Sequence, residues 1–380
     1  MSELIGLRKK SEDSRRNLLA NVSLVALLGC TVAFSGAQAA VAGDNSPSVW
    51  IELGGQLERV DGTHAVWTPA FFDLAQPAVL ATLEGSQRPS RYSSGAEGKI
   101  SLMPRGSNWV LSAALRYGRV QNSRHLHYQT PGLPTVFGTF NKAPLVIKPA
   151  RKNFGDGQTT LGESHFVIDF QAGKDVGLGL FGNSVVSAGV RYTQFTSRSD
   201  ETFHARPVLG YSPAIQYVSG GKYHSVHKVF RQTYTATLHT ARNTRAVGPS
   251  LSWDGSVPVI ESHEGMMVGF EWGLNAAALF GRQRTLEDHR TTGYSLHYNG
   301  KVKSANHYTH IASHNRSRSV FIPNVGGFAG VSLKFPNAKV NVGYRGDFFF
   351  NATDSGIDVR DAANQSFYGP FATISIGLGR

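Results

Sequence analysis

Apolar and polar residues alternate along Met266–Gly281, where every even-numbered position is apolar and the odd-numbered positions are mixed in character. A β-strand sends successive side chains to opposite faces, so this pattern predicts a strand with one fully apolar face. The stretch is far longer than the roughly five or six residues typical of strands in soluble proteins, and a membrane-crossing strand needs about nine to eleven. We therefore expect a membrane-crossing strand whose apolar face contacts lipid.

A buried helix is the alternative for this stretch, because Gly269 and Gly273 form the G-x-x-x-G pattern of paired membrane helices. Glu271 and Asn275 interrupt the segment, so it lacks the roughly 18 consecutive apolar residues of a membrane helix. Interior glycines also disfavour a helix, each by about 1 kcal/mol relative to alanine. The strand is the better interpretation.

Other segments along the chain show the same alternation. They are Val49–Arg59, Ala96–Met103, Trp109–Val120, Ser164–Gly173, Ser184–Thr196, Gln232–Trp253, Ser319–Lys334, Lys339–Phe350 and Ser366–Gly379. A sheet in lipid tolerates no unpaired edge, so strands of this kind must close on themselves. The sequence predicts an all-β fold, a closed antiparallel transmembrane β-barrel of about ten strands, with eight or twelve as alternatives.

The connections between these segments alternate in length. Long ones span 60–95, 121–163, 197–231, 282–318 and 351–365, and short ones span 104–108, 174–183, 254–265 and 335–338. Long extracellular loops that alternate with short periplasmic turns are typical of outer-membrane barrels. We therefore expect the long connections to form irregular loops outside the cell.

Alternation also assigns side chains to the two walls of the barrel. The candidates for the lumen are Glu52, Glu58, Lys99, Arg116, Asp169, Arg191, Glu271, Arg345 and Asp347. The candidates for contact with lipid are Phe270, Trp272, Leu274 and Phe280. Charges of both signs can set the ion preference of an open channel, or they can pair and fill a narrow barrel. The sequence leaves both possibilities open.

Composition limits the class of protein. Hydrophobic residues make up 41% of the 380 residues and the mean hydropathy is −0.21, which argues against a helical membrane protein. The single cysteine, Cys30, lies in an expected signal peptide, so disulfides and cysteine-ligated metals are not expected in the mature chain. The net charge of +12 favours anionic partners. For an exported protein we expect lipopolysaccharide phosphates or anionic solutes, and not nucleic acid.

The N-terminus resembles a secretory signal peptide of residues 1–39, followed by a barrel domain of residues 40–380. Arg15 and Arg16 belong to a basic start, Leu18–Phe34 is apolar, and Ala37–Ala39 is an A-x-A cleavage signal. A twin-arginine signal and a lipoprotein signal at Cys30 are weaker alternatives. These features predict Sec export, cleavage near Ala39, insertion by the barrel-assembly machinery and a place in the bacterial outer membrane.

The predicted loop 282–318 is rich in basic residues and histidines. Its basic candidates for phosphate or solute binding are Arg282, Arg284, Arg290, Lys301, Lys303, Arg316 and Arg318, with a solvated surface as the alternative. Its histidines are His289, His297, His307, His310 and His314. His307 and His310 are near enough in sequence to share a metal, but no carboxylate cluster accompanies them, so we predict no metal and no cofactor.

Catalytic constellations are sparse. Asp200, Glu201 and His204 lie together in sequence, but the G-x-S-x-G, P-loop, H-E-x-x-H and dinucleotide fingerprints are absent from the chain. We expect a protein without enzymatic activity.

Short motifs in the mature chain resemble those of legionella-type pore-forming outer membrane proteins, which are major-outer-membrane-protein-like barrels. They are Trp50–Gly55, Gly189–Phe195, Val247–Pro249, Leu279–Arg282 and Tyr368–Pro370. The resemblance implies a pore and no catalytic residues. We therefore expect a passive outer-membrane pore for small hydrophilic solutes. The alternative is a closed structural or adhesin-type barrel that acts through basic extracellular loops. Solute and oligomeric state stay open.

Overall fold

The computed structural model describes residues 48–62, 67–71, 77–88, 91–104, 107–130, 138–140, 143–145, 153–176, 183–206, 215–219, 222–226, 228–261, 266–299 and 302–378. Pro47–Leu378 form one compact unit. The expected signal peptide, residues 1–39, lies outside the described residues, so the predicted boundary at residue 40 stays a prediction.

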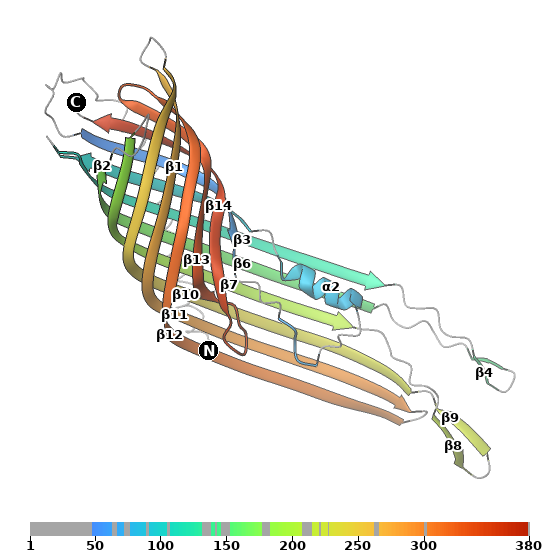
Figure 1. The fold of residues 1–380 in the computed structure, drawn as a ribbon. Helices are drawn as coiled ribbons and strands as arrows, with labels where there is room; N and C mark the ends of the chain where they lie inside the picture. Colours follow the sequence, from blue (N-terminus) through green and yellow to red (C-terminus); the bar gives the residue numbers. More distant parts are fainter. Residues whose placement is uncertain are drawn as a thin grey trace, which may run out of the picture. The chain divides into compact units, whose positions relative to one another are not determined.

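Ten antiparallel strands form the main sheet (Figure 1). They are β1 (Ser48–Asp61), β2 (Tyr92–Met103), β3 (Trp109–Thr130), β6 (Asn153–Asp175), β7 (Asn183–Arg206), β10 (Lys228–Glu261), β11 (Met267–Asn299), β12 (Val302–Lys334), β13 (Ala338–Asp354) and β14 (Ala362–Leu378). Each segment predicted from alternation falls within one of these strands to within a residue or two. The all-β class and the count of ten strands are confirmed.

The sheet closes into a ring because the first strand of the chain pairs with the last. Glu52 of β1 lies opposite Ser375 of β14 on one side and opposite Lys99 of β2 on the other. The order around the ring is β1-β14-β13-β12-β11-β10-β7-β6-β3-β2, and β2 returns to β1. Within the ring, each strand is thereby paired on both sides, whereas β12 before Asn324 and β3 beyond Arg119 pair with one neighbour only.

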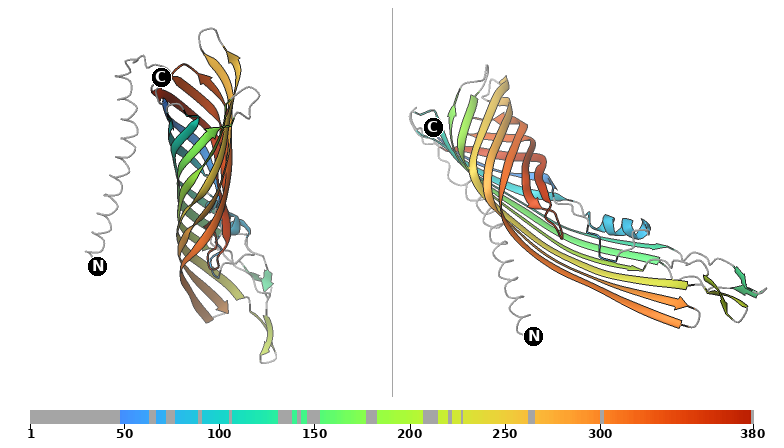
Figure 2. Two further views of the ribbon diagram at one scale, coloured as in Figure 1. Left: turned by 60° about the vertical axis from the view of Figure 1, so that its left-hand side comes forward. Right: turned by 60° about the horizontal axis from the view of Figure 1, so that its bottom comes forward.

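The ring strands differ greatly in length. Strands β10, β11 and β12 have 34, 33 and 33 residues, whereas β1 and β2 have 14 and 12. At about 3.3 Å per residue, β11 is about 110 Å long, more than three times the roughly 30 Å of a bilayer's hydrocarbon core. Strands β3, β6, β7, β10, β11 and β12 continue as a curved sheet beyond the ends of the other four (Figures 1 and 2).

We call this continuation the projecting sheet. It comprises residues 119–130 of β3, 153–164 of β6, 196–206 of β7, 228–245 of β10, 282–299 of β11 and 302–319 of β12. Its inner face continues the inside of the ring, and its outer face continues the outside.

The projecting sheet corrects the prediction of irregular loops at 121–163, 197–231 and 282–318. Much of each range is strand, and β11 and β12 stay paired from Met267–Lys334 up to Asn299–Val302. Alternation did not reveal these strands because both faces carry many polar residues there, so the hydrophobic contrast between the faces is weak. The prediction held better at 335–338, where residues 335–337 form a short turn between β12 and β13.

The connection from β1 to β2 contains the helix α2 (Pro77–Ser86), which contacts β3 and β6 (Figure 2). Trp67 and Leu83 of this connection bury against Phe203, Ala205, Ala236 and Leu238 on the inner face of the projecting sheet. Two further connections contain the small sheets β4–β5 (Gly138–Phe140 and Ala143–Leu145) and β8–β9 (Ile215–Ser219 and Lys222–Val226).

Within the described residues, no helix is both long enough and apolar enough to span a lipid bilayer.

Candidate functional site

The inside of the ring is crossed by charged contacts between strands that are not neighbours. Arg116 of β3 pairs with Asp347 of β13, four places away in the ring. Arg345 of β13 pairs with Glu97 of β2, three places away. These side chains are largely buried, so each ion pair occupies part of the cross-section of the barrel.

Arg191 of β7 contacts both the neighbouring strand β6 and strands further round the ring. Its Nε and Nη2 donate to the two carboxylate oxygens of Asp169 at 2.6 and 3.0 Å. Its Nη1 donates to Asn275 Oδ1 at 2.7 Å and also to Asn324 Oδ1, which lie on β11 and β12. The planar guanidinium suits this bidentate contact, and full pairing offsets the cost of burying both charges.

A hydrophobic layer lies beside these polar contacts, toward the projecting sheet. It consists of Val60, Val120, Val167, Phe195, Ala246, Leu279, Val320, Ile322, Phe349, Ala352 and Phe367. Every ring strand except β2 contributes at least one of these residues. A layer supplied from all sides of the ring fills the interior, as side chains do in narrow barrels.

Two cavities lie among these interior side chains in the described part of the chain, and both are small. A cavity of about 20 Å³ is lined in part by Glu58, Arg116 and His165, and another of about 10 Å³ is lined in part by Val60 and Phe195. A single water molecule needs roughly 10–15 Å³ measured in this way. Each of these two cavities therefore has room for about one water molecule, and neither amounts to a channel.

The outer wall of the ring is apolar. Leu274 and Phe280 expose 56% and 60% of their surface, Phe270 is exposed as well, and Trp272 packs edge-on against Trp253 with ring centroids 4.7 Å apart. Other strands present the same kind of side chain, including Leu53, Ile100, Leu115, Phe170, Val190, Leu251, Phe321, Val342 and Ile374. The exposed apolar residues thus form a belt around all ten strands.

The belt ends at the same level on neighbouring strands. Phe280 of β11 lies opposite Val247 and Phe321, whereas two residues further along Arg282 lies opposite Arg245 and Ser319. On β11 the outer positions that follow are Arg284, Leu286, Asp288 and Arg290. The outer wall therefore changes from apolar to polar and basic where the projecting sheet begins.

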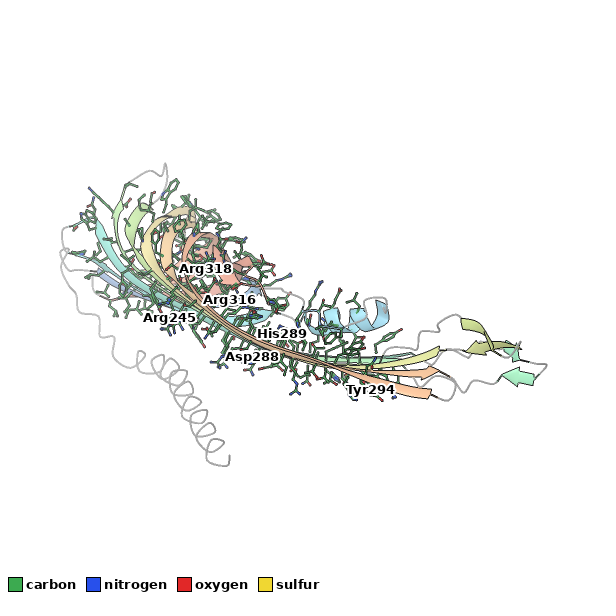
Figure 3. The ribbon with its side chains drawn as sticks, turned by 90° about the horizontal axis from the view of Figure 1, so that it is seen from below. Arg245, Asp288, His289, Tyr294, Arg316 and Arg318 are labelled. Carbon is green, nitrogen blue, oxygen red and sulfur yellow. The ribbon has the colours of Figure 1, made fainter. Side chains whose placement is uncertain are left out.

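A network of ion pairs lies on the inner face of the projecting sheet. Glu287 of β11, fully buried, accepts from Arg242 of β10 at 2.9 Å and from Arg316 of β12 at 3.0 Å. Arg316 also donates to Asp354 Oδ2 at 3.1 Å. In Figure 3, Arg316 and His289 lie on the side of the sheet that faces α2.

The same network holds the turn 355–361 between β13 and β14. Arg316 donates to the carbonyl oxygens of Gly356 and Ile357 at 2.8 and 2.7 Å. Asp354 Oδ1 accepts from the backbone amides of Gly356 and Asp361 at 3.1 and 3.0 Å. Backbone groups of the turn are thus anchored to β12, and the position of Asp358 at its tip is defined.

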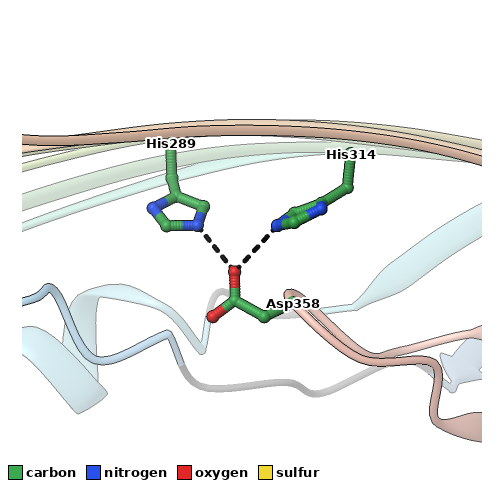
Figure 4. A group of neighbouring side chains, drawn as sticks. All are labelled: His289, His314 and Asp358. Atoms are coloured by element: carbon green, nitrogen blue, oxygen red, sulfur yellow. Dashed lines mark hydrogen bonds and ion pairs between the residues drawn. The ribbon is translucent and has the colours of Figure 1, made fainter.

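Two histidines converge on that aspartate (Figure 4). His289 Nε2 lies 2.8 Å from Asp358 Oδ1, and His314 Nε2 lies 3.1 Å from the same oxygen. The side chain of His289 is 4% exposed, whereas those of His314 and Asp358 are 34% and 64% exposed. The hydrogen bond with His289 lowers the pKa of Asp358 below its ordinary value. These three residues offer two imidazole nitrogens and a carboxylate to a ligand.

The predicted lumen candidates all lie on the inner face of the ring. Besides the residues above, Glu52 accepts a hydrogen bond from Ser375 Oγ at 2.8 Å, Lys99 is half-buried, and Glu271 pairs with Lys334 and Lys339. The predicted lipid candidates Phe270, Trp272, Leu274 and Phe280 all lie on the outer face. The structure gives their direction; contact with lipid stays a proposal.

The basic candidates do not form a loop, which corrects the sequence prediction. Arg282, Arg284 and Arg290 project from the outer face of β11, and Arg316 and Arg318 belong to the inner-facing positions of β12. Lys303 lies in β12, and Lys301 lies outside the described residues. Arg316 is committed to structural ion pairs, so it is not a free site for solutes.

Asp200, Glu201 and His204 are close together in sequence, but strand β7 directs their side chains to different faces of the sheet. Glu201 faces inward and is buried, while Asp200 and His204 face outward; Asp200 pairs with His239. His307 and His310 lie on opposite faces for the same reason, since three positions along a strand reverse the side chain. Sequence reasoning missed His289 with Asp358, because the strand parity of 282–318 was not recognised and Asp358 is distant in sequence.

Comparison with known proteins gave neither a matching family model nor a matching curated protein. Among solved structures, the outer membrane protease OmpT of Escherichia coli is 12% identical, covering 90% of this chain and 99% of that one, with a TM-score of 0.36. The transport unit of the Escherichia coli autotransporter AIDA-I is 6% identical, covering 92% and 96%, with a TM-score of 0.21. The deltaS2 mutant of the TodX monoaromatic hydrocarbon channel is 10% identical, covering 88% and 90%, with a TM-score of 0.20. At these values, none assigns a family, an activity or a ligand to this chain.

Proposed function

We propose that this chain is a closed β-barrel of a bacterial outer membrane that holds a basic binding sheet at the cell surface. The observation that carries the proposal is the contrast between the two walls of the ring. Apolar side chains face outward on all ten strands, while the interior is filled by ion pairs and a hydrophobic layer.

The outward belt supports a membrane location. Soluble monomers rarely expose contiguous apolar patches larger than a few hundred Å², and a belt that surrounds the molecule exceeds this. In lipid the same side chains contact hydrocarbon, and closure of the ring pairs the first strand with the last, so the ring itself has no free edge strand. Belt and ring closure thus meet the two physical requirements of a spanning sheet.

The level of the bilayer follows from the polarity of the outer wall. Phe280 and Phe321 pack in a tilted arrangement with ring centroids 5.1 Å apart at the upper end of the belt, and Arg282 and Arg245 lie one step beyond. Arginine at this level reaches the phosphates of lipid headgroups. We propose lipopolysaccharide phosphates as its partner, with the projecting sheet outside the cell and the short turns in the periplasm.

Because side chains fill the interior, the structure supports a structural or adhesin-type barrel with a blocked lumen better than it supports a passive pore. A pore for hydrophilic solutes needs a continuous wet path, and Phe195, Phe349 and Phe367 meet across the interior where such a path must pass. Ion pairs such as Arg191–Asp169 consume the charges that could line a channel. The barrel then acts as an anchor, and its function lies in what the projecting sheet binds.

The proposal concerns binding and not catalysis. The acid and histidine residues that sequence had grouped at 200–204 are divided between two faces. Sec export with cleavage near Ala39 and insertion by the barrel-assembly machinery remain part of the proposal. The resemblance to the legionella-type pore-forming family remains part of it for the barrel, but not for the pore.

Conductance in planar bilayers tests the proposal. The refolded full chain is expected to insert and to give no discrete conductance steps at a protein load where a known porin conducts. Its insertion is established separately, by co-flotation with lipid vesicles. Discrete steps from the inserted protein would favour the passive pore, and failure to float with vesicles would contradict the membrane location itself.

A further inference from the structure

We propose that His289, His314 and Asp358 form a binding site for a divalent transition-metal ion of the Zn²⁺ type. The site lies on the inner face of the projecting sheet, beyond the belt, where β11, β12 and the turn 355–361 meet (Figures 3 and 4). It is independent of whether the barrel conducts, so the proposal goes beyond the function proposed above.

The ligand atoms have the spacing of a coordination shell. His289 Nε2, His314 Nε2 and one oxygen of Asp358 lie within 4.8 Å of one another, and the two nitrogens are 2.8 and 3.1 Å from Asp358 Oδ1. Four ligands at about 2.0–2.1 Å from a tetrahedral zinc ion are about 3.3 Å apart. Small side-chain rotations therefore bring the three atoms to metal-binding distances without a change in the backbone.

Strand register explains why the histidines meet. His289 lies opposite Ala312, so His310 and His314 are its two diagonal neighbours on β12, on the same face of the sheet. The ring centroids of His310 and His314 lie 5.2 and 6.2 Å from that of His289. Diagonal neighbours at this separation remain within reach of long side chains.

The buried histidine is held in place by packing. Trp67 lies against the ring of His289 with centroids 6.0 Å apart, and the Nδ1 atom of His289 is buried without a hydrogen-bond partner in the described part of the chain. Nε2 is thus the ring nitrogen directed toward the other two ligands. A ligand fixed before binding loses little conformational entropy when the ion arrives.

The carboxylate is positioned by the turn that carries it. Arg316 donates to two carbonyl oxygens of this turn, and Asp354 accepts from two of its amides. Outer groups that orient the ligands contribute strongly to metal affinity. The turn is therefore a rigid support for Asp358 even though the side chain itself is exposed.

The donor set selects the class of ion. Imidazole suits Zn²⁺, Cu²⁺ and Ni²⁺, whereas Mg²⁺ and Ca²⁺ prefer six or more oxygen ligands. Three protein ligands leave a fourth position that faces solvent, since His314 and Asp358 are partly exposed. A water molecule, His310 or a donor from a bound molecule completes the coordination.

Zinc titration of the full chain tests the site. The protein, without a polyhistidine tag and refolded in detergent, is titrated with ZnCl₂ by calorimetry and with CoCl₂ by visible absorption, which reports the coordination geometry. We expect one ion per chain, a tetrahedral cobalt spectrum, and no comparable heat from MgCl₂ or CaCl₂. Each of His289→Ala, His314→Ala and Asp358→Asn is expected to weaken zinc binding by about tenfold or more.

His239→Ala is the matched control. His239 also pairs with a carboxylate, that of Asp200, but on the outer face of the same sheet. The pair offers one imidazole and one carboxylate, one ligand fewer than the proposed site. This variant is expected to bind zinc as the unaltered chain does. Equal zinc affinity in the unaltered chain and in a folded His289→Ala variant, judged by circular dichroism, would overturn the proposal, as would an absence of zinc binding to the unaltered chain.

Discussion

Phe195 of β7 and Phe349 of β13 meet edge to face inside the barrel, with ring centroids 4.8 Å apart and planes inclined at 66°. The two strands are four places apart in a ring of ten, so this contact spans the interior. Phe367 of β14 completes the group, stacking on Phe195 at 5.9 Å. These three rings are the clearest reason to regard the interior of the barrel as blocked.

Removing two of the rings is expected to open the barrel. The double variant Phe195→Ala, Phe349→Ala leaves a gap in the hydrophobic layer and costs about 3–5 kcal/mol of stability per ring. It should show conductance steps in planar bilayers where the unaltered chain is silent. The matched control is Phe280→Ala, Phe321→Ala, a pair of rings in contact on the outer wall, which should stay silent. Equal behaviour of the two folded double variants would contradict the sealing role of the interior pair.

A charge in the middle of the belt is expected to destabilise the barrel in lipid. Leu274→Arg places a guanidinium among outward apolar side chains, at a cost of about 2–4 kcal/mol if it lies near the bilayer midplane. Leu286→Arg is the matched control, because Leu286 lies on the same face of β11 beyond Arg282 and should change stability by less than about 0.5 kcal/mol. Urea unfolding in vesicles measures both. A similar loss in the two variants is incompatible with the proposed level of the bilayer.

Much of the barrel could be predicted from sequence because lipid imposes the pattern directly. Where β11 crosses the belt, outward Phe270 and Leu274 alternate with inward Glu271 and Asn275. The difference in hydrophobicity between the two faces of the strand is largest there. The same contrast placed Asp169, Arg191 and Asp347 on the inner face. Whether these charges leave a pore could not be predicted, because pairing across the ring depends on the register of strands far apart in sequence.

The projecting sheet and its histidine cluster could not be predicted for a related reason. Outside lipid, both faces of a strand accept polar residues, so Thr285, Glu287 and His289 alternate with Arg284, Leu286 and Asp288 without a clear apolar face. Asp358 approaches His289 only because β13 and β14 close the ring and their turn folds over the sheet. The sequence does contain one signal: His310 and His314 are four positions apart, and residues separated by an even number of positions lie on the same face of a strand.

Glu201 is expected to make stability depend on pH. It lies on the inner face of the projecting sheet, and burial is the main cause that raises its pKa from 4.5 to about 7, opposed by a hydrogen bond from Ser199 and by the charge of Arg242. Between these values the folded chain binds more protons than the unfolded chain, so stability falls as pH rises. The loss is complete above pH of about 7 and amounts to at most about 3 kcal/mol.

The variant Glu201→Gln removes this loss, since a neutral amide cannot ionise. Its unfolding temperature should exceed that of the unaltered chain at pH of about 8 by more than at pH of about 5. Ser199→Ala should act in the opposite direction, because the lost hydrogen bond, at 2.9 Å from Glu201 Oε1, favoured the charged form. Thermal unfolding followed by circular dichroism in detergent gives the comparison; an identical pH dependence in all three proteins would show that Glu201 is not the group responsible.

Arg316 is expected to control the rigidity of the turn 355–361. Its guanidinium contacts Glu287, Asp354 and two turn carbonyls at once, and a lysine, as a point charge, cannot reproduce that forked geometry. Hydrogen bonds to charged groups contribute about 1.5–3 kcal/mol each, so Arg316→Lys should speed amide exchange in the turn about tenfold or more. Arg318→Lys is the control, because Arg318 lies two positions along β12 and donates only to the backbone of its own neighbour, Ser319, among the described contacts. Exchange measured by mass spectrometry should rise at 355–361 in the first variant and not in the second. If the turn exchanges equally in both, its order comes from its other contacts, those of the Asp354 side chain and of Ser355 with Asp361.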